Sequence, residues 1–284
     1  MKGKERFVIH KRLVTGEQGA AADLLAASSG LSKTAVKDAM TKGAVWLKRG
    51  TQAKRRLRRA TAELKPGDLV EFYYDQKLLQ RDCPEARLVA DKGRYSVWLK
   101  PAGMLTAGTP YGDHCTLERY VEKASEPGRA VLLVHRLDRE TPGLMVVAHD
   151  REAAAAFSGL LQRLQVEKRY RAEVKGCVAA RLGERGEVNT PIEGRAARTR
   201  FSVVAYDPEL DVTTLDVELV TGRMHQVRRH FAAAGFPVLG DPRYGHGNKD
   251  RRGLRLLAYR LAFRCPVSGQ PQEFVLNPAE FGYR

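Results

Sequence analysis

The chain has 284 residues, of which 43% are hydrophobic and 29% charged. That composition can fill a sizeable core, which excludes a wholly disordered protein, and the length predicts a medium domain with a smaller one attached. Lys and Arg number 49 against 33 Asp and Glu, a net charge of +16, so the expected partner is a polyanion, first of all a nucleic acid.

A membrane protein is not expected. The longest apolar runs are short, such as residues 130–134 and 144–148, whereas a helix needs roughly 20 apolar residues to span a bilayer. Residues 1–6 carry charges with no apolar segment behind them, so we expect no signal peptide and a cytoplasmic protein without a membrane partner.

The sequence also contains no motif for metal or cofactor chemistry. The cysteines Cys83, Cys115, Cys177 and Cys265 match no zinc or redox spacing, and we expect them to be free thiols. His225 and His230 are five residues apart rather than four, so we expect them to pack or to contact RNA rather than to bind a metal. No P-loop, dinucleotide-binding glycine motif or HExxH motif occurs, and the sequence predicts no cofactor.

Positive charge is concentrated near the N-terminus. Residues 1–75 hold 16 Lys and Arg against 8 Asp and Glu, so about a quarter of the chain carries half of the net charge. Apolar residues four apart predict a helix over 34–41, and a short strand is expected over 44–47. A Pro-Gly turn at 66–67 leads into a further strand.

The order of these parts, in "SKTAVKDAMTKGAVWL" and "LKPGDLVEF", resembles the small αL RNA-binding module named after ribosomal protein S-four. The resemblance implies that Lys33, Lys37 and Lys42 face RNA phosphates. A denser basic run follows, which is either a solvated surface or a second set of phosphate contacts. From its charge alone we infer phosphate contacts. The run comprises Lys54, Arg55, Arg56, Arg58 and Arg59.

We expect a linker over residues 76–90 and a larger domain over 91–284. Short apolar and alternating runs predict strands over 95–99, 131–134, 144–148, 168–175 and 215–219, with helices over 150–164 and 224–234. Strands mixed irregularly with helices indicate an α+β fold, in which helices flank a mixed, largely antiparallel sheet.

The loop over residues 135–143 follows one of these apolar strands and holds four ionisable side chains in its first five positions. Asp138 lies between Arg136 and Arg139, whose positive charges would keep its carboxyl group ionised. On its residues alone, the loop is either a reactive site or a Pro-Gly turn that Asp138 or Thr141 organises.

Four ordered motifs within about residues 91–284 resemble the RluA-type pseudouridine synthases. They are "LKPAGMLT", "VHRLDRETPGLMVVAHD", "EKRYRAEVKG" and "LVTGRMHQVRRHFAAAGFPVLGDPRYG". The resemblance implies an isomerase that converts uridine to pseudouridine within RNA. Pro142, Met145 and Met224 depart from the residues that are frequent in the family. They remove no functional group, but they leave the loop conformation and the substrate choice open.

The resemblance also implies roles for single residues. Asp138 would be the catalytic residue, and Arg136 would displace or replace the flipped-out nucleotide. Tyr170 would stack on the target base and is a candidate general base, and Arg223 would pair with the catalytic carboxylate. An ionised carboxylate can attack the sugar as a nucleophile or remove a proton from it to start an elimination, and the sequence leaves both routes open.

The RNA target is open between ribosomal and transfer RNA, and the basic N-terminal module favours large-subunit ribosomal RNA. We expect the protein to act as a monomer. Two other functions fit part of the sequence. One is an RNA-binding or ribosome-assembly factor whose isomerase site is silent, and the other is a glycosylase that releases free uracil and leaves an abasic site.

Overall fold

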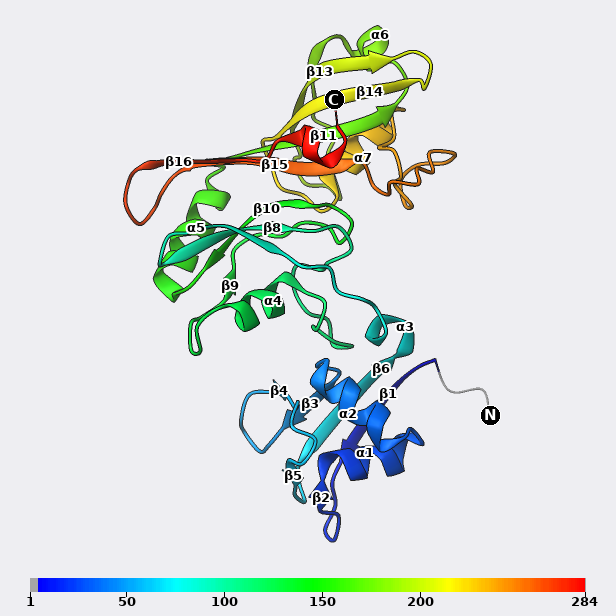
Figure 1. The fold of residues 1–284 in the computed structure, drawn as a ribbon, viewed down its shortest axis with the longest axis vertical. Helices are drawn as coiled ribbons and strands as arrows, with labels where there is room; N and C mark the ends of the chain where they lie inside the picture. Colours follow the sequence, from blue (N-terminus) through cyan, green and yellow to red (C-terminus); the bar gives the residue numbers. More distant parts are fainter. Residues whose placement is uncertain (1–4, 284) are drawn as a thin grey trace. The chain divides into compact units, whose positions relative to one another are not determined.

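The computed structural model describes residues 5–283, which form two compact units (Figure 1). The first unit comprises the described residues up to Pro84 together with Leu105–Pro127. The second comprises Glu85–Met104 together with the described residues from Gly128 onwards. Residues 1–4, on which the expected absence of a signal peptide partly rests, lie outside the described residues.

The first unit contains a four-stranded antiparallel sheet in the order β1-β6-β3-β4. Its strands are β1 (Arg6–Arg12), β3 (Val45–Lys48), β4 (Arg55–Arg56) and β6 (Leu69–Asp75), and β2 (Gly19–Ala20) pairs with β5 (Glu63–Leu64). The helices are α1 (Ala21–Ser29), α2 (Lys33–Thr41), α3 (Gln76–Leu79) and α4 (Leu117–Ala124). Phe72 of β6 shares one buried core with Val36 and Met40 of α2.

Local chemistry explains the bounds of α2, which confirms the helix expected over 34–41. The helix begins after Ser32 because the Ser32 side chain accepts a hydrogen bond from the Ala35 N–H at 3.2 Å. It ends before Gly43, whose φ of 83° lies in the left-handed region that favours glycine. The expected strand follows directly as β3.

The observed units differ from the expected division into 1–75, 76–90 and 91–284. Part of the expected linker forms α3, and its end begins β7 (Arg87–Asp91) of the second unit. Leu105–Pro127 groups with the first unit, where Asp113 pairs with Arg56 at 2.9 Å and also with Arg58. These contacts join residues more than fifty positions apart, so no local pattern in the sequence indicates them.

The second unit is built on a ten-stranded sheet with the neighbour order β12-β13-β14-β11-β15-β10-β8-β7, in which β16 also pairs with β15 and β9 with β10. The strands are β7, β8 (Tyr95–Lys100), β9 (Leu132–Leu133), β10 (Gly143–Ala148), β11 (Val166–Lys175), β12 (Arg185–Val188), β13 (Thr199–Asp207), β14 (Val212–Leu219), β15 (Leu256–Arg264) and β16 (Pro271–Val275). The helices are α5 (Arg151–Gln162), α6 (Val178–Leu182) and α7 (Gln226–Ala233). Only β10 and β15 pair in parallel among the described strands, so the expected mixed, largely antiparallel α+β fold is confirmed.

Helix α5 covers the part of this sheet formed by β8 and β15. Asp150 caps the helix by accepting the Ala153 N–H at 2.8 Å, as its position in the sequence indicates. Phe157 then packs edge-on against Tyr95 of β8 and Phe263 of β15, with ring centroids 5.0 and 5.3 Å apart. The layer of aromatic rings fixes the helix on the sheet.

The parallel contact between β10 and β15 depends on a glycine. Gly143 lies directly beside Ala258, and its φ is 144°. A Cβ atom at position 143 would lie 2.4 Å from the Ala258 carbonyl oxygen and 2.5 Å from the Ala258 Cβ. Only glycine therefore lets the two strands approach at this point, which is the end of the loop that carries Asp138.

Gly143→Ala should lower the free energy of unfolding of the second unit by about 3–5 kcal/mol, because it adds both a backbone clash and an unfavourable φ. Gly269→Ala is the matched control: Gly269 has a φ of +71° but nothing lies within 4 Å of an added Cβ. Its expected cost is about 1–2 kcal/mol. Urea denaturation monitored by circular dichroism measures both, and equal losses would contradict the close approach.

Candidate active site

The loop that carries Asp138 is fastened to the sheet on both sides. Ahead of it, the His135 ring accepts the Val146 N–H at 2.9 Å. Beyond it, the fully buried Lys100 ammonium donates to three backbone carbonyl groups, including that of Arg139, at 2.8–3.1 Å. The backbone around Asp138 is therefore held by side chains of the sheet and by β10, which fixes where the carboxylate points.

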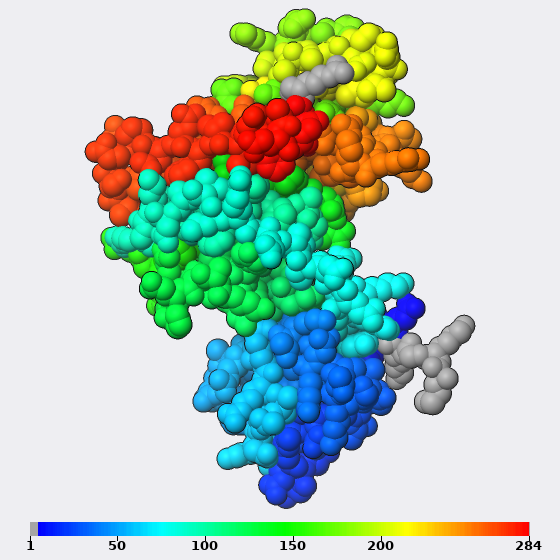
Figure 2. All heavy atoms as spheres, viewed as in Figure 1, coloured from blue at the N-terminus to red at the C-terminus, as the bar shows by residue number. Residues whose placement is uncertain are grey.

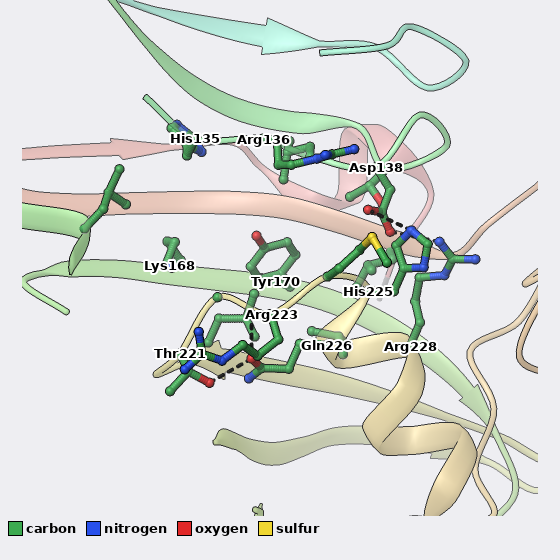
Figure 3. A pocket seen from close by; sticks show the side chains of 18 of the residues that line it. His135, Arg136, Asp138, Lys168, Tyr170, Thr221, Arg223, His225, Gln226 and Arg228 are labelled. Carbon is green, nitrogen blue, oxygen red and sulfur yellow. Dashed lines mark hydrogen bonds and ion pairs between the residues drawn. The ribbon is translucent and has the colours of Figure 1, made fainter. Parts of the chain in front are cut away.

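Two side chains hold the Asp138 carboxylate (Figure 3). One terminal nitrogen of Arg228 donates to Oδ2 at 2.8 Å, and His225 Nε2 lies 3.4 Å from Oδ1. The Asp138 side chain is 19% exposed, so solvent and a substrate can still reach it. A charge-assisted hydrogen bond of this kind is strong and restricts the orientation of the carboxylate.

Arg228 is itself anchored from behind by Asp241. Its Nε and second terminal nitrogen donate to the two Asp241 oxygens at 2.7 and 2.8 Å, and the Asp241 side chain is wholly buried. Burial alone would raise the pKa of Asp241, but the hydrogen bonds from Arg228 and from the Arg243 and Tyr244 amides lower that pKa below its ordinary value. Both carboxylates, in turn, raise the pKa of Arg228 against the effect of burial.

The expected pairing of Arg223 with Asp138 is wrong. Among the described residues, Arg228 donates to the carboxylate, while Arg223 Nε donates to the Ala196 carbonyl at 3.0 Å. The helix expected from position 224 starts later, at Gln226, because His225 adopts a left-handed conformation with φ of 55°. Arg223 therefore precedes α7, and Arg228, which lies within the helix, points at Asp138.

Tyr170 lies on β11 and lines the same pocket as Asp138. The ring is 7% exposed, and Figure 3 shows it between Lys168 and Asp138 in this view. Burial and then the negative charge of Asp138 raise the pKa of its hydroxyl far above neutrality. The phenol stays protonated at neutral pH, which favours the expected stacking role over that of a general base.

The pocket has a volume of about 710 Å³, which lies in the range of small-molecule sites. Its wall includes Arg136, Asp138, Lys168, Tyr170, Arg223 and Arg228, contributed by the Asp138 loop, β11 and the start of α7. Apolar side chains such as Leu161 and Val134 line it as well. A planar base can be buried here with a carboxylate at one end and cationic groups around it.

Residues 94–233 match the family model described as RNA pseudouridylate synthase. Over 226 residues the chain is 32% identical to an uncharacterized RNA pseudouridine synthase of Bacillus subtilis (strain 168), which covers 74% of this chain and 69% of that protein. The chain belongs to the RluA-type RNA pseudouridine synthase family. The resemblance of its four motifs to this family, including the loop with Asp138, therefore reflects common descent.

This chain covers a smaller share of the length of other relatives. The chain spans 53% and 60% of two uncharacterized RNA pseudouridine synthases, from Aquifex aeolicus (strain VF5) and Chloroflexus aurantiacus, at 35% identity to each. It is 34% identical over 204 residues to ribosomal large subunit pseudouridine synthase D of Xanthomonas campestris pv. campestris, covering 61% of this chain and 60% of that one. Human RNA pseudouridylate synthase domain containing 1 shares the fold, with a TM-score of 0.57 at 24% identity over 68% of this chain and 84% of that chain.

Several residues of this site have roles that the sequence did not indicate. Arg228 and His225 lie in the quoted motif, but nothing in their spacing distinguishes Arg228 from its neighbours Arg223 and Arg229. Asp241 lies in the same motif, thirteen positions from Arg228, and only the fold brings its carboxylate to the guanidinium.

The basic residues expected to bind RNA through the first unit have mixed surroundings. Lys33 and Lys42 form surface ion pairs with Asp23 and Asp38, each at 2.9 Å. Lys37, Arg55 and Arg59 are exposed. Lys54 pairs with Glu71, and Arg56 and Arg58 both pair with Asp113. Arg56 and Arg58 thus hold the first unit together, and the dense basic run is only partly a free surface.

Within residues 5–283, no group of three or more His, Cys, Asp or Glu side chains is placed to hold a metal ion. His230 instead bonds Thr199 and the Thr190 carbonyl, each at 2.9 Å. No helix in this part of the chain is both long and apolar enough to cross a bilayer.

Arg228→Gln should lower the free energy of unfolding by about 3–5 kcal/mol, because it leaves the buried Asp241 carboxylate without its ion-pair partner. Arg223→Gln is the matched control and should cost no more than about 1 kcal/mol, since the hydrogen bond of the Arg223 side chain to the Ala196 carbonyl group is exposed. Chemical denaturation of both variants checks this, and a larger loss for Arg223→Gln would contradict the assignment.

A second prediction concerns acid stability. Burial, and then the nearby Lys168 ammonium, lower the pKa of His135 from 6.5 to about 4. Between these values the unfolded chain binds a proton at this position that the folded chain does not, so stability falls as the pH falls. His135→Gln keeps a hydrogen-bond acceptor but does not titrate, and its melting temperature should fall less than that of the wild type from pH 6.5 to pH 4.

His246→Gln is the control for this experiment, because His246 is exposed. Its melting temperature should follow the wild-type pH profile. Parallel profiles for the wild type and His135→Gln would show that His135 does not have its low pKa.

Proposed function

We propose that this chain isomerises uridine to pseudouridine in RNA, with Asp138 as the catalytic residue. The observation that carries the proposal is the partly exposed Asp138 carboxylate, held by Arg228 in a pocket large enough for a nucleoside. In the reaction the C1′–N1 bond of uridine breaks, the uracil turns, and a C1′–C5 bond forms. The C5 proton is lost and N1 gains a proton, so nothing is released and no redox step is needed.

Asp138 is suited to either of two first steps. As an ionised carboxylate it can attack C1′ and release the uracil, or it can remove the proton on C2′ and start an elimination. Arg228 supports both steps, because its charge-assisted hydrogen bond orients the carboxylate and its anchor on Asp241 prevents it from moving. Tyr170, which carries no charge at neutral pH, offers a flat face to the uracil.

A uridine in folded RNA must leave its stack to enter the pocket, which costs a few kcal/mol. Arg136 is exposed and lies two residues before Asp138, so it can occupy the space that the base leaves. Stacking of the uracil on Tyr170 would return about 1–3 kcal/mol. These two residues therefore support base flipping, and Arg223 at the pocket wall can contact the same nucleotide.

Large-subunit ribosomal RNA is the substrate that we favour. Two features support it: synthases named for the ribosomal large subunit are among the similar proteins, and the first unit carries exposed basic residues suited to phosphates. In this proposal the first unit is an S-four-like RNA-binding domain that uses Lys33, Lys37, Lys42, Arg55 and Arg59.

Asp138→Asn should abolish pseudouridine formation, with a loss of at least about 10³-fold, because the amide keeps the shape but neither attacks nor removes a proton. The measurement is carbodiimide-dependent primer extension on unmodified large-subunit ribosomal RNA incubated with each protein. Binding of the same RNA should persist, since the rest of the surface is unchanged.

Two other outcomes would replace the proposal. If neither the wild type nor Asp138→Asn modifies RNA while both bind it, the chain is a silent RNA-binding or ribosome-assembly factor. If the wild type releases free uracil and leaves abasic sites, it is a glycosylase, because isomerisation leaves the RNA mass unchanged.

A further inference from the structure

A cluster of arginines surrounds one exposed carboxylate beside the active site, in the second unit. Arg229 donates to Glu193 Oε1 at 2.7 Å, although the Glu193 side chain is 62% exposed. The hydrogen bond from Arg229 is the largest influence that lowers the pKa of Glu193, and the positive charges of Arg195 and Arg243 lower it further. We call Arg195, Arg229 and Arg243 the arginine cluster.

Glu193 is held over the cluster by a tight turn. Ile192 and Arg195 exchange both backbone hydrogen bonds, at 2.9 and 3.0 Å, so Glu193 and Gly194 are the two central residues of a two-residue hairpin. Both have positive φ, 51° and 71°, as a type I′ turn requires. Glycine, asparagine and aspartate are the usual residues there, so a glutamate at the first position is held at a cost in backbone strain.

The cluster shares its support with the catalytic carboxylate. The Tyr244 ring lies under the guanidinium groups of Arg229 and Arg243, at 5.9 and 5.4 Å from the ring centroid, and under that of Arg228 at 5.2 Å. Its hydroxyl bonds His225 Nδ1 at 2.8 Å. One aromatic ring therefore contacts both Arg228, which bonds Asp138, and Arg229, which bonds Glu193.

Chain geometry places the cluster next to the pocket. Arg229 directly follows Arg228, a pocket-lining residue, and Arg243 lies two residues after Asp241. The positive charge of Arg243 also acts on the pocket residue His225. The segment around Arg243 lies in the orange part of the chain, which Figure 2 shows at the molecular surface.

We propose that the arginine cluster binds a phosphodiester group of the RNA substrate, and that this group displaces the Glu193 carboxylate from Arg229. The inference rests on the proposed function, because a uridine in the pocket stays joined to the RNA through the phosphates on either side. Planar guanidinium groups suit phosphate oxygens as they suit a carboxylate. Glu193 then keeps Arg229 oriented in the absence of RNA and competes with RNA that binds weakly.

The test measures the affinity of the full chain for a fluorescein-labelled RNA hairpin with uridines in its loop, by fluorescence anisotropy, from about 50 to about 300 mM salt. The double variant Arg229→Gln, Arg243→Gln should bind about tenfold more weakly, and its slope of log K against log salt should be less steep by about 0.7–0.9, the value for one phosphate. Arg87→Gln is the control, because Arg87 is exposed on β7 and far from the arginine cluster. Strand β7 ends the sheet order on one side, whereas α7, which carries Arg229, packs on β13 near the other end.

Glu193→Gln gives an effect of opposite sign and changes only an exposed side chain. It should bind the hairpin about threefold more tightly at low salt, and the gain should shrink as salt screens the removed charge. Glu193→Gln therefore tests the phosphate site even if the arginine variant unfolds. The melting temperature of the arginine variant would show whether it is folded.

An unchanged slope in the arginine variant, an equal effect of Arg87→Gln, or unchanged binding by Glu193→Gln would overturn the phosphate site. None of these results would contradict the proposed function, because pseudouridine formation by the wild type is measured separately. Conversely, Asp138→Asn should bind the hairpin with the same salt dependence as the wild type. The salt slopes can therefore still be compared even if the wild type makes no pseudouridine.

Discussion

The guanidinium group of Arg228 lies between two carboxylates, and the site depends on that arrangement. On its inner side it forms two hydrogen bonds to the buried Asp241, and on its outer side one to Asp138. The Asp138 carboxylate is thus held in one orientation by a guanidinium group that is itself fixed from behind.

The backbone constraint beneath this arrangement comes from the sheet. Lys100 at the end of β8, His135 ahead of the Asp138 loop, and Gly143 at the start of β10 each fix a different point of the loop. Lys100 is a buried charge that donates to three backbone carbonyl groups. A side chain whose loop is fixed at several points is held more rigidly than one on a free loop.

Arginines of one short segment take three different surroundings in this fold. Arg223 bonds a carbonyl group, Arg228 joins two carboxylates, and Arg229 turns to the exposed Glu193. In the first unit, Arg56 likewise pairs with Asp113 instead of standing free. A high positive charge therefore predicts a polyanionic partner, but it does not say which cations remain free for that partner.

The sequence by itself determined the local features: the helix α2 and the strand after it, the cap of α5 by Asp150, the α+β class and the loop that carries Asp138. These depend on residues a few positions apart, whose chemistry acts within one turn or one strand. Only the tertiary structure decided that Arg228 and not Arg223 holds Asp138, and that Asp113 binds Arg56. Those pairings join residues 90 and 57 positions apart. The left-handed conformation of His225 also shifts the start of α7. Long-range contacts depend on where strands and helices pack, which the local pattern does not encode.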